Sequence, residues 1–466
     1  EVKMCRLSTD LRRSLSTAGK TFLIALLVGL LAGCQVTPPT VGTWSPTNPS
    51  AQLPSSTPPT LDAPLGSPVS TPTASLFTAT PFPPLADLPL SEISYVIPLT
   101  LQAVSEDSAV FLFELDRPAV GSLLLRSTDQ AEEFVQAFPI SSSTPYQLIT
   151  VAPLEADREY EAILALQAED GAFKQPAFLG EAWGSVRFRT QRAAEPLHVG
   201  VIGDSGFGEL VTAQLVEQMA GEQLDFVIHT GDLVYNASEN ASPAEAFALK
   251  YFQPFAPLLH QLPIYAVPGN HDYAQDARVD GSPYYFHAFP SLSDAKWVTQ
   301  PLPAKRQYYA LVYQNIQFIF LDSQVFFGEE GSEEQDAWLT QRLQDDQFAY
   351  SVVITHVPLF TSSVIHPADS QPVRQAWHGK FAEAGVPLVL SGHSHNYERL
   401  VVDGVTYVVT GGGSSQLYPA LKVDPHSQAF SVSSHFVLLE FFEDQIKILA
   451  IDKNGKILDR AQVLLP

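Results

Sequence analysis

Hydrophobic residues are spaced in three ways along the 466-residue chain, and each spacing predicts a different kind of segment. Residues 21–32 (TFLIALLVGLLA) form one continuous apolar run. From 91 to 190, short runs with alternating apolar and polar positions are separated by turn residues, which is typical of a β-sandwich. From 197 onward, apolar runs stop abruptly at clusters of Gly, Asp, Asn and His. The chain therefore divides into an N-terminal segment, a β-domain and a third region with candidate chemistry.

The first apolar run is shorter than the ~20 residues that a membrane-spanning helix needs, and basic residues precede it. It leads into Leu-Ala-Gly-Cys at 31–34, which resembles the lipobox of bacterial lipoproteins. We therefore expect residues 1–33 to be a signal peptide and Cys34 to carry lipid. The protein is then exported and lipid-anchored to the outer face of a bacterial membrane. Arg12 and Arg13 leave twin-arginine export open beside the general route.

Residues 34–90 form a segment rich in Pro, Ser and Thr. Fourteen of the chain's 37 prolines lie between 35 and 90, and the only charges there are Asp62 and Asp87. A segment with so little apolar surface cannot offset the entropy lost on folding. It is predicted to be an extended tether between the anchor and the folded domains.

Residues 91–190 carry a specific signature of sandwich domains. The sequence LEADREY at 154–160 leads into a strand and resembles the approach to the tyrosine corner of fibronectin type III domains. We expect Tyr160 to bond upstream backbone rather than to bind a ligand.

Residues 197–466 are predicted to form a domain of alternating strands and helices, so the fold class is α/β with a β-sandwich in front. Five apolar strands are expected at 197–202, 226–230, 264–267, 351–355 and 386–390, with helices at 209–220 and 333–345. Such apolar runs suit strands that are buried on both faces. Because ligands in open α/β sheets bind beyond the carboxyl ends of the strands, we expect the clusters to converge at one edge.

The clusters that follow these strands hold oxygen and imidazole donors. The candidate ligands are Asp204, Asp232, Tyr235, Asn270, His356, His393 and His395. This mixture suits iron, zinc or manganese, and a carboxylate can bridge two such ions. A phenol ionises near pH 10 unaided, so Tyr235 as a ligand favours Fe3+. The only cysteines, Cys5 and Cys34, precede the folded region and leave no thiolate for this site.

The clusters also form ordered sequence blocks. They are Asp-x-Gly (204–206), Gly-Asp-x-x-Tyr (231–235), Gly-Asn-His-Asp (269–272), Val-x-x-His (353–356) and Gly-His-x-His (392–395). In this order they resemble the metal-binding blocks of purple acid phosphatases, which are calcineurin-like metallophosphoesterases and commonly carry a fibronectin-like sandwich before the catalytic domain. PhoD-type alkaline phosphatases are similar in layout but use a cysteine ligand, which is absent here.

The resemblance implies a mixed α/β sandwich fold for this domain and a dinuclear centre of Fe3+ and a divalent ion (Zn, Fe or Mn). Its ligands would be Asp204, Tyr235 and His395 for iron, Asn270, His356 and His393 for the divalent ion, and Asp232 as the bridge. The function implied is hydrolysis of phosphate monoesters by a metal-activated hydroxide. His271, beside a ligand, and His366, ten positions after His356, are candidates for the general acid or a transition-state donor. Asp272 is expected to orient His271.

Charge limits the partners. The net charge is −24, and because residues 1–33 hold five basic and two acidic side chains, the rest carries 21 basic and 48 acidic ones, or −27. Nucleic-acid binding is therefore not expected, and the partners are a small phosphorylated substrate and a membrane reached through the lipid anchor. Two alternatives stay open: a phosphodiesterase or nucleotide hydrolase with the same metals, and an inactive surface-binding lipoprotein. The oligomeric state is also open.

Overall fold

The computed structural model describes residues 88–128, 136–193, 196–290, 292, 298–299 and 307–465. The predicted signal peptide, Cys34 and all but the end of the predicted tether lie outside these ranges. Within them, no helix combines the length and the apolar character that crossing a membrane requires.

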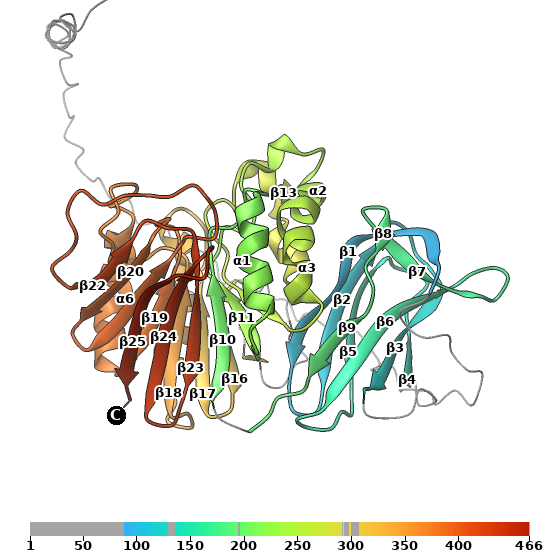
Figure 1. Ribbon diagram of the computed structural model, residues 1–466, viewed down its shortest axis with the longest axis horizontal. Coiled ribbons are helices and arrows are strands. Elements are labelled where there is room, and N and C mark those ends of the chain that lie inside the picture. Colours follow the sequence, from blue (N-terminus) through green and yellow to red (C-terminus); the bar gives the residue numbers. More distant parts are fainter. Residues whose placement is uncertain are drawn as a thin grey trace, which may run out of the picture. The chain divides into compact units, whose positions relative to one another are not determined.

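The first folded region consists of strands (Figure 1). They are β1 (Leu90–Val104), β2 (Ala109–Leu115), β3 (Gly121–Ser127), β4 (Gln136–Pro139), β5 (Tyr146–Val151), β6 (Glu159–Gln167), β7 (Phe173–Phe178), β8 (Glu181–Ala182) and β9 (Val186–Arg189). The order is β4-β3-β6-β7-β1-β2-β5, with β9 paired to β6 and β8 to β7. The long strand β1 joins the two halves, because its start pairs with β7 and the rest pairs with β2.

The two halves of this sheet enclose one apolar core. Phe111 of β2 meets Phe188 of β9 edge to face, with ring centroids 5.5 Å apart. Tyr160 of β6 lies in the same core, and its phenol oxygen accepts a hydrogen bond from the backbone N–H of Glu155 at 2.9 Å. The predicted bond from Tyr160 to upstream backbone is therefore confirmed, whereas the likeness to fibronectin domains stays a prediction.

The second folded region contains two large sheets (Figure 1). The first has the order β12-β11-β10-β23-β24-β25, with β10 (Leu197–Ile202), β11 (Phe226–His229), β12 (Ile264–Ala266), β23 (His435–Phe441), β24 (Gln445–Asp452) and β25 (Ile457–Leu464). The second has the order β15-β16-β17-β18-β19-β21-β20-β22, with β15 (Val298–Thr299), β16 (Tyr309–Tyr313), β17 (Ile316–Leu321), β18 (Tyr350–Thr355), β19 (Leu388–Ser391), β20 (Tyr397–Val402), β21 (Val405–Thr410) and β22 (Ser427–Ser431). A small hairpin is formed by β13 (Arg278–Val279) and β14 (Ser282–Pro283).

Helices connect these strands. The α-helices are α1 (Leu210–Ala220), α2 (Pro243–Phe247), α3 (Gln253–Leu259), α4 (Tyr285–Ala288), α5 (Ser332–Leu343) and α6 (Ser370–Glu383). Short turns of 3-10 helix are η2 (Ala237–Glu239), η4 (Gln275–Ala277) and η5 (Ser323–Phe326), and η3 (Ala248–Phe252) is a π-helical turn between α2 and α3. The helices predicted at 209–220 and 333–345 correspond to α1 and α5.

The central strands are apolar on both faces because each sheet is covered on both sides. Neighbouring residues of a strand point to opposite faces. In β11, Ile228 lies in the core between the two sheets, while Val227 packs with buried residues of α1 and α3. In β18, Ile354 faces the same inter-sheet core and Val353 packs with Trp377 of α6. The region therefore has four layers, helix–sheet–sheet–helix, and the predicted fold class is confirmed.

One expectation about the layout was too simple. The five predicted strands do not share one sheet edge, because β10, β11 and β12 belong to the first sheet and β18 and β19 to the second. Apolarity on both faces fits either arrangement, since a partner sheet buries a strand face as well as a helix does. The loops after all five strands nevertheless meet, as described next.

Candidate metal centre

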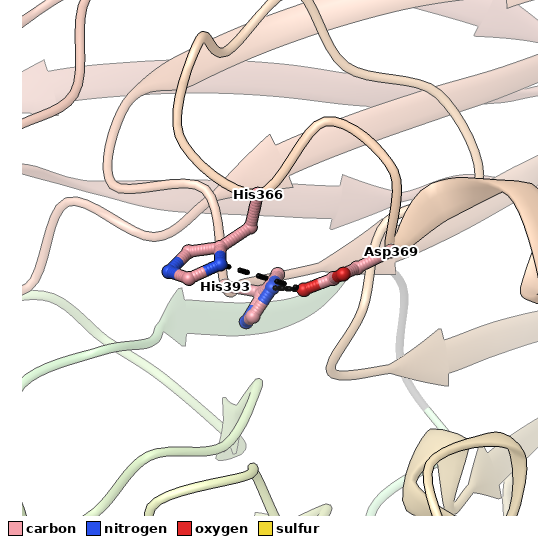
Figure 2. Close-up of side chains that lie close together, drawn as sticks. All are labelled: His366, Asp369 and His393. Carbon is pink, nitrogen blue, oxygen red and sulfur yellow. Dashed lines mark hydrogen bonds and ion pairs between the residues drawn. The ribbon is translucent and has the colours of Figure 1, made fainter. Parts of the chain in front are cut away.

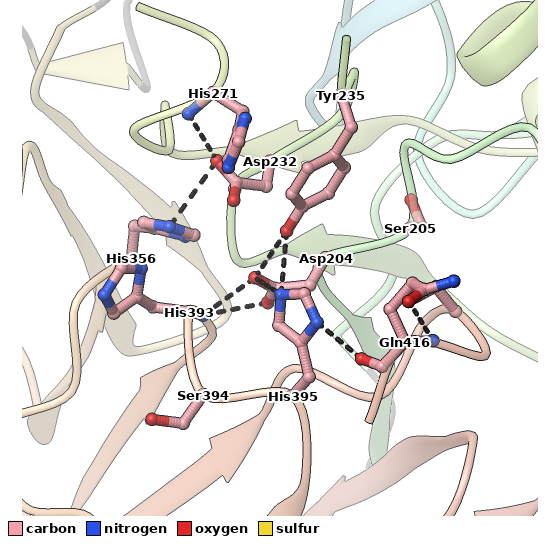
Figure 3. Close-up of polar contacts among 12 residues, drawn as sticks. Asp204, Ser205, Asp232, Tyr235, His271, His356, His393, Ser394, His395 and Gln416 are labelled. Atoms are coloured by element: carbon pink, nitrogen blue, oxygen red, sulfur yellow. Dashed lines mark hydrogen bonds and ion pairs between the residues drawn. The ribbon is translucent and has the colours of Figure 1, made fainter. Parts of the chain in front are cut away.

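The loops that follow the strands present their side chains from strained backbone. Asp204, Asp232 and His393 have φ of 57°, 55° and 62°, in the left-handed region that residues other than glycine rarely adopt. Such strain is concentrated at functional sites, where the surrounding structure holds it in place. One ligand atom from each of Asp204, Asp232 and His356 lies within 4.8 Å of the others, deep in the protein (Figure 3). The loops therefore gather acceptor atoms at one point.

Each of the three predicted histidine ligands has one ring nitrogen tied to an oxygen that can only accept. His356 Nδ1 donates to Thr230 O at 2.8 Å, and His395 Nδ1 donates to Gln416 O at 2.5 Å. His393 Nε2 donates to a carboxylate oxygen of Asp369 at 3.0 Å. In the neutral form of each ring, the other nitrogen then carries no proton and can serve as a metal ligand.

The free nitrogens of two rings meet at Asn270. His356 Nε2 and His393 Nδ1 each lie 3.0 Å from Asn270 Oδ1. His356 Nε2 is also 3.5 Å from a carboxylate oxygen of Asp232. Acceptor atoms thus face one another, which is the arrangement that a cation stabilises. This group fits the predicted divalent site.

The second group surrounds the phenol of Tyr235. Its oxygen lies 2.9 Å from His395 Nε2 and 3.1 Å from a carboxylate oxygen of Asp204, to which it donates. Phe207 stacks on the Tyr235 ring at 3.8 Å and 13°, and the His271 ring lies 4.2 Å from it. The phenol is therefore shielded from water, with its oxygen directed at Asp204 and His395 (Figure 3).

The protonation states suit metal binding. Burial, together with the charges of Asp204 and Asp232, raises the pKa of Tyr235 well above 10, so only a strongly attracting cation would hold this phenol as a phenolate. Burial alone would raise the pKa of Asp204, but the neighbouring histidines lower it to about 2. Burial lowers the pKa of His393 to about 4. At neutral pH the carboxylate of Asp204 is therefore charged, and the imidazole of His393 is neutral.

Asp272 has a role that differs from the one expected. It does not orient His271 through any described contact; its buried carboxylate accepts backbone N–H bonds from Gly269 at 2.8 Å and Asp232 at 2.9 Å. The backbone N–H of His271 donates in turn to Asp232 Oδ1 at 2.8 Å. Asp272 therefore holds together the loops after β11 and β12 and fixes the Asp232 backbone. The sequence signal for a role of Asp272 at this site was its place as the fourth residue of the Gly-Asn-His-Asp block.

Lys250, in η3, was not anticipated from the sequence. Its side chain is only 8% exposed, and its ammonium group bonds Tyr235 O at 2.8 Å, Asn236 O at 3.2 Å and Glu239 at 2.9 Å. It holds the loop that carries the phenol. The signal was a single lysine inside the apolar stretch 246–255 (AFALKYFQPF), because a buried lysine needs partners.

The two candidate catalytic histidines lie beside different metal-ligand groups. His271 lies against Tyr235, as described above, and the His366 ring is 5.3 Å from that of His393 (Figure 2). The His366 side chain is 57% exposed, and its Nδ1 lies 3.7 Å from Asp369. Both are therefore next to the centre, and His366 faces solvent.

Two further polar residues of this domain have supporting roles. His229 is fully buried in β11 and bonds Ser205 Oγ through Nε2 at 2.8 Å, so it supports the loop of Asp204 rather than binding a ligand. Arg399 pairs with Asp459 at 2.7 Å, so it forms a structural ion pair.

Known proteins resemble this chain in sequence and in structure. Residues 197–397 match the calcineurin-like phosphoesterase family. Purple acid phosphatase 22 of Arabidopsis thaliana is 24% identical over 218 residues, covering 46% of this chain and 47% of the plant protein. The chain spans about half the length of the plant relatives it matches.

Two solved structures share the fold. Purple acid phosphatase PPD1 from yellow lupin (Lupinus luteus) seeds gives a TM-score of 0.62 at 15% identity, covering 78% of this chain and 74% of its own. PhoD gives 0.57 at 13% identity, covering 79% and 93%. The stretch 197–397, which holds the strand-end blocks and the acceptor cluster, is therefore similar to calcineurin-like phosphoesterases, and plant purple acid phosphatases are among the proteins that it resembles.

Proposed function

We propose that the protein is a metal-dependent phosphoric monoester hydrolase that is held outside the cell by a lipid on Cys34. The observation that carries the proposal is the convergence of three imidazole rings, each with one nitrogen bonded to a backbone or carboxylate oxygen, on carboxylate, amide and phenol oxygens. In this proposal Tyr235, Asp204 and His395 hold Fe3+, and Asn270, His356 and His393 hold the divalent ion. Asp232 bridges them.

The charge of this donor set suits a phosphate. A trivalent and a divalent ion carry five positive charges, and two carboxylates with one phenolate neutralise three of them. The centre is then a local cationic site in a protein whose net charge is −24, which would otherwise repel a phosphate ester. A dinuclear centre of this kind lowers the pKa of water and withdraws charge from phosphoryl oxygens.

The chain's own residues provide the remaining functions. His366, exposed beside His393, can donate a hydrogen bond to a phosphoryl oxygen or a proton to the leaving alkoxide. His271, against Tyr235, can bind the same group from the other side. The Phe207 ring keeps water from the phenol. The proposal assigns both histidines as donors and neither as a nucleophile.

One experiment tests the activity. The purified chain should contain two metal ions, show a visible charge-transfer band, and hydrolyse p-nitrophenyl phosphate faster than bis(p-nitrophenyl) phosphate. His393→Ala should remove the divalent ion and the turnover while the circular dichroism spectrum is retained. Faster hydrolysis of the diester would replace monoesters by diesters as substrates, and a chain with no metal would refute the proposal.

A separate experiment tests the anchor. Cys34→Ser should move the protein from the membrane fraction to the soluble fraction of a bacterial host, because one lipid-bearing side chain is removed and the folded domains are unchanged. Release of the unsubstituted protein in the same assay would refute lipid anchoring.

A further inference from the structure

Asp369 lies at the N-cap of α6 but does not cap the helix. Aspartate is favoured at this position because its carboxylate accepts N–H bonds of the first helical turn. Here the side chain makes no such bond. One carboxylate oxygen instead accepts from His393 Nε2 at 3.0 Å and lies 3.7 Å from His366 Nδ1 (Figure 2). The carboxylate is thus directed away from its ordinary local partner and toward the centre.

The three histidine ligands differ in what holds their second nitrogen. For His356 and His395 the acceptor is a backbone carbonyl, which no substitution removes. For His393 the acceptor is the side chain of Asp369, which carries a full charge. A carboxylate is a stronger acceptor than a carbonyl, and such partners fix the ring tautomer and increase the basicity of the ligating nitrogen.

We propose that Asp369 is a positioning residue of the divalent site. It keeps the proton of His393 on Nε2 and presents Nδ1 toward Asn270, and it thereby sets the affinity of the site for its ion. This inference rests on the proposed function, because it takes the Asn270, His356 and His393 group to hold a metal. It adds a residue outside the seven predicted ligands.

The test measures Zn2+ binding to the iron-loaded full chain by competition with a chelator. Asp369→Asn should weaken Zn2+ binding by roughly 10- to 100-fold, the range found when such outer partners are removed. The iron band at Tyr235 should keep its intensity, because His395 is held by a backbone carbonyl. Because Asp369 makes no N-cap bond and asparagine still offers an acceptor oxygen to His393, the unfolding free energy should stay close to that of the unsubstituted protein.

The chain offers a matched control in Asp403→Asn. Asp403 pairs with His378 Nε2 at 3.0 Å, the same distance as between Asp369 and His393, and His378 lies on helix α6. This variant should leave Zn2+ affinity unchanged.

Three outcomes would overturn the inference. Unchanged Zn2+ affinity in Asp369→Asn, with a wild-type chain that binds both ions, overturns the inference alone. Equal loss of iron and zinc together with a lower unfolding free energy assigns Asp369 to the fold and also overturns it. A wild-type chain that binds neither ion overturns the proposed function and the inference together.

Discussion

The buried amine of Lys250 should be essential for the geometry of the loop that carries Tyr235. Lys250→Met keeps an unbranched, apolar side chain of similar length but removes the ammonium group. Two backbone carbonyls, of Tyr235 and Asn236, then lose their hydrogen-bond donor. The variant therefore tests whether the ammonium group of Lys250 holds this loop in place.

The magnitude follows from the bonds that are lost. A hydrogen bond to a charged group contributes about 1.5 kcal/mol or more, so the two bonds, one to buried Tyr235 and one to the more exposed Asn236, amount to roughly 3 kcal/mol. The ion pair with Glu239 adds little, because the carboxylate of Glu239 is exposed to water. The free energy of unfolding of the metal-free protein should fall by about 3 kcal/mol.

Denaturant unfolding of the metal-free protein measures this loss, and the visible band of the iron-loaded protein reports on Tyr235. Lys250→Met should lower the unfolding free energy and shift or weaken the band. Glu239→Gln, which removes only the exposed partner, is the control and should change neither. If Lys250→Met lowered stability by less than about 0.5 kcal/mol and left the band unchanged, the assigned role of the amine would be wrong.

Two further predictions concern buried groups near other loops. Burial raises the pKa of Asp322 to about 6, and Tyr273 donates to it at 2.5 Å. The folded state then retains a proton that the unfolded chain releases, so the free energy of unfolding falls by ~3 kcal/mol as pH rises from 3.8 to about 6. Asp322→Asn should abolish this pH dependence in denaturant titrations. A variant whose unfolding free energy changes with pH as that of the unsubstituted protein does would contradict the prediction. Gly392→Ala would place a Cβ 2.4 Å from Asp204 Oδ2 and should displace this carboxylate, costing about 1–3 kcal/mol and the bound iron. In contrast, the Cβ added by Gly379→Ala inside α6 meets nothing within 4 Å, and this variant should stabilise the protein by up to about 1 kcal/mol. If Gly392→Ala retained its iron, the loop would have relaxed around the new Cβ and the prediction for this variant would be wrong.

The strands and their terminal blocks were predictable because both signals are local. An apolar run such as 351–355 and the His356 that follows it are adjacent in the sequence, and the helix at 333–345 has its own amphipathic pattern. In contrast, α6 was not predicted, since Pro372 and Gly379 weaken its helical pattern although Trp377 and Phe381 are spaced by four and buried.

The division into two sheets and the supporting residues could not be predicted from local patterns. A buried strand has the same composition whether a helix or a second sheet covers it. Asp369 and Lys250 act on residues that lie 24 and 15 positions away in the sequence. Such pairs are set by the tertiary fold, and no spacing rule links them. The predicted ligands had no such difficulty because each lies a few residues after the end of a strand.

The origin of the seven proposed ligands in two different sheets has a mechanical consequence. Asp204 and Asp232 follow strands of the first sheet, whereas His356 and His393 follow strands of the second. Bound ions would link two layers that otherwise meet mainly through apolar side chains, with hydrogen bonds such as that from the Tyr309 hydroxyl to Ala266 O. An ion that binds only the folded state adds about 2.7 kcal/mol when it is present at a hundred times its Kd. A shortage of metal would then stop turnover and, at the same time, loosen the domain and expose it to proteases.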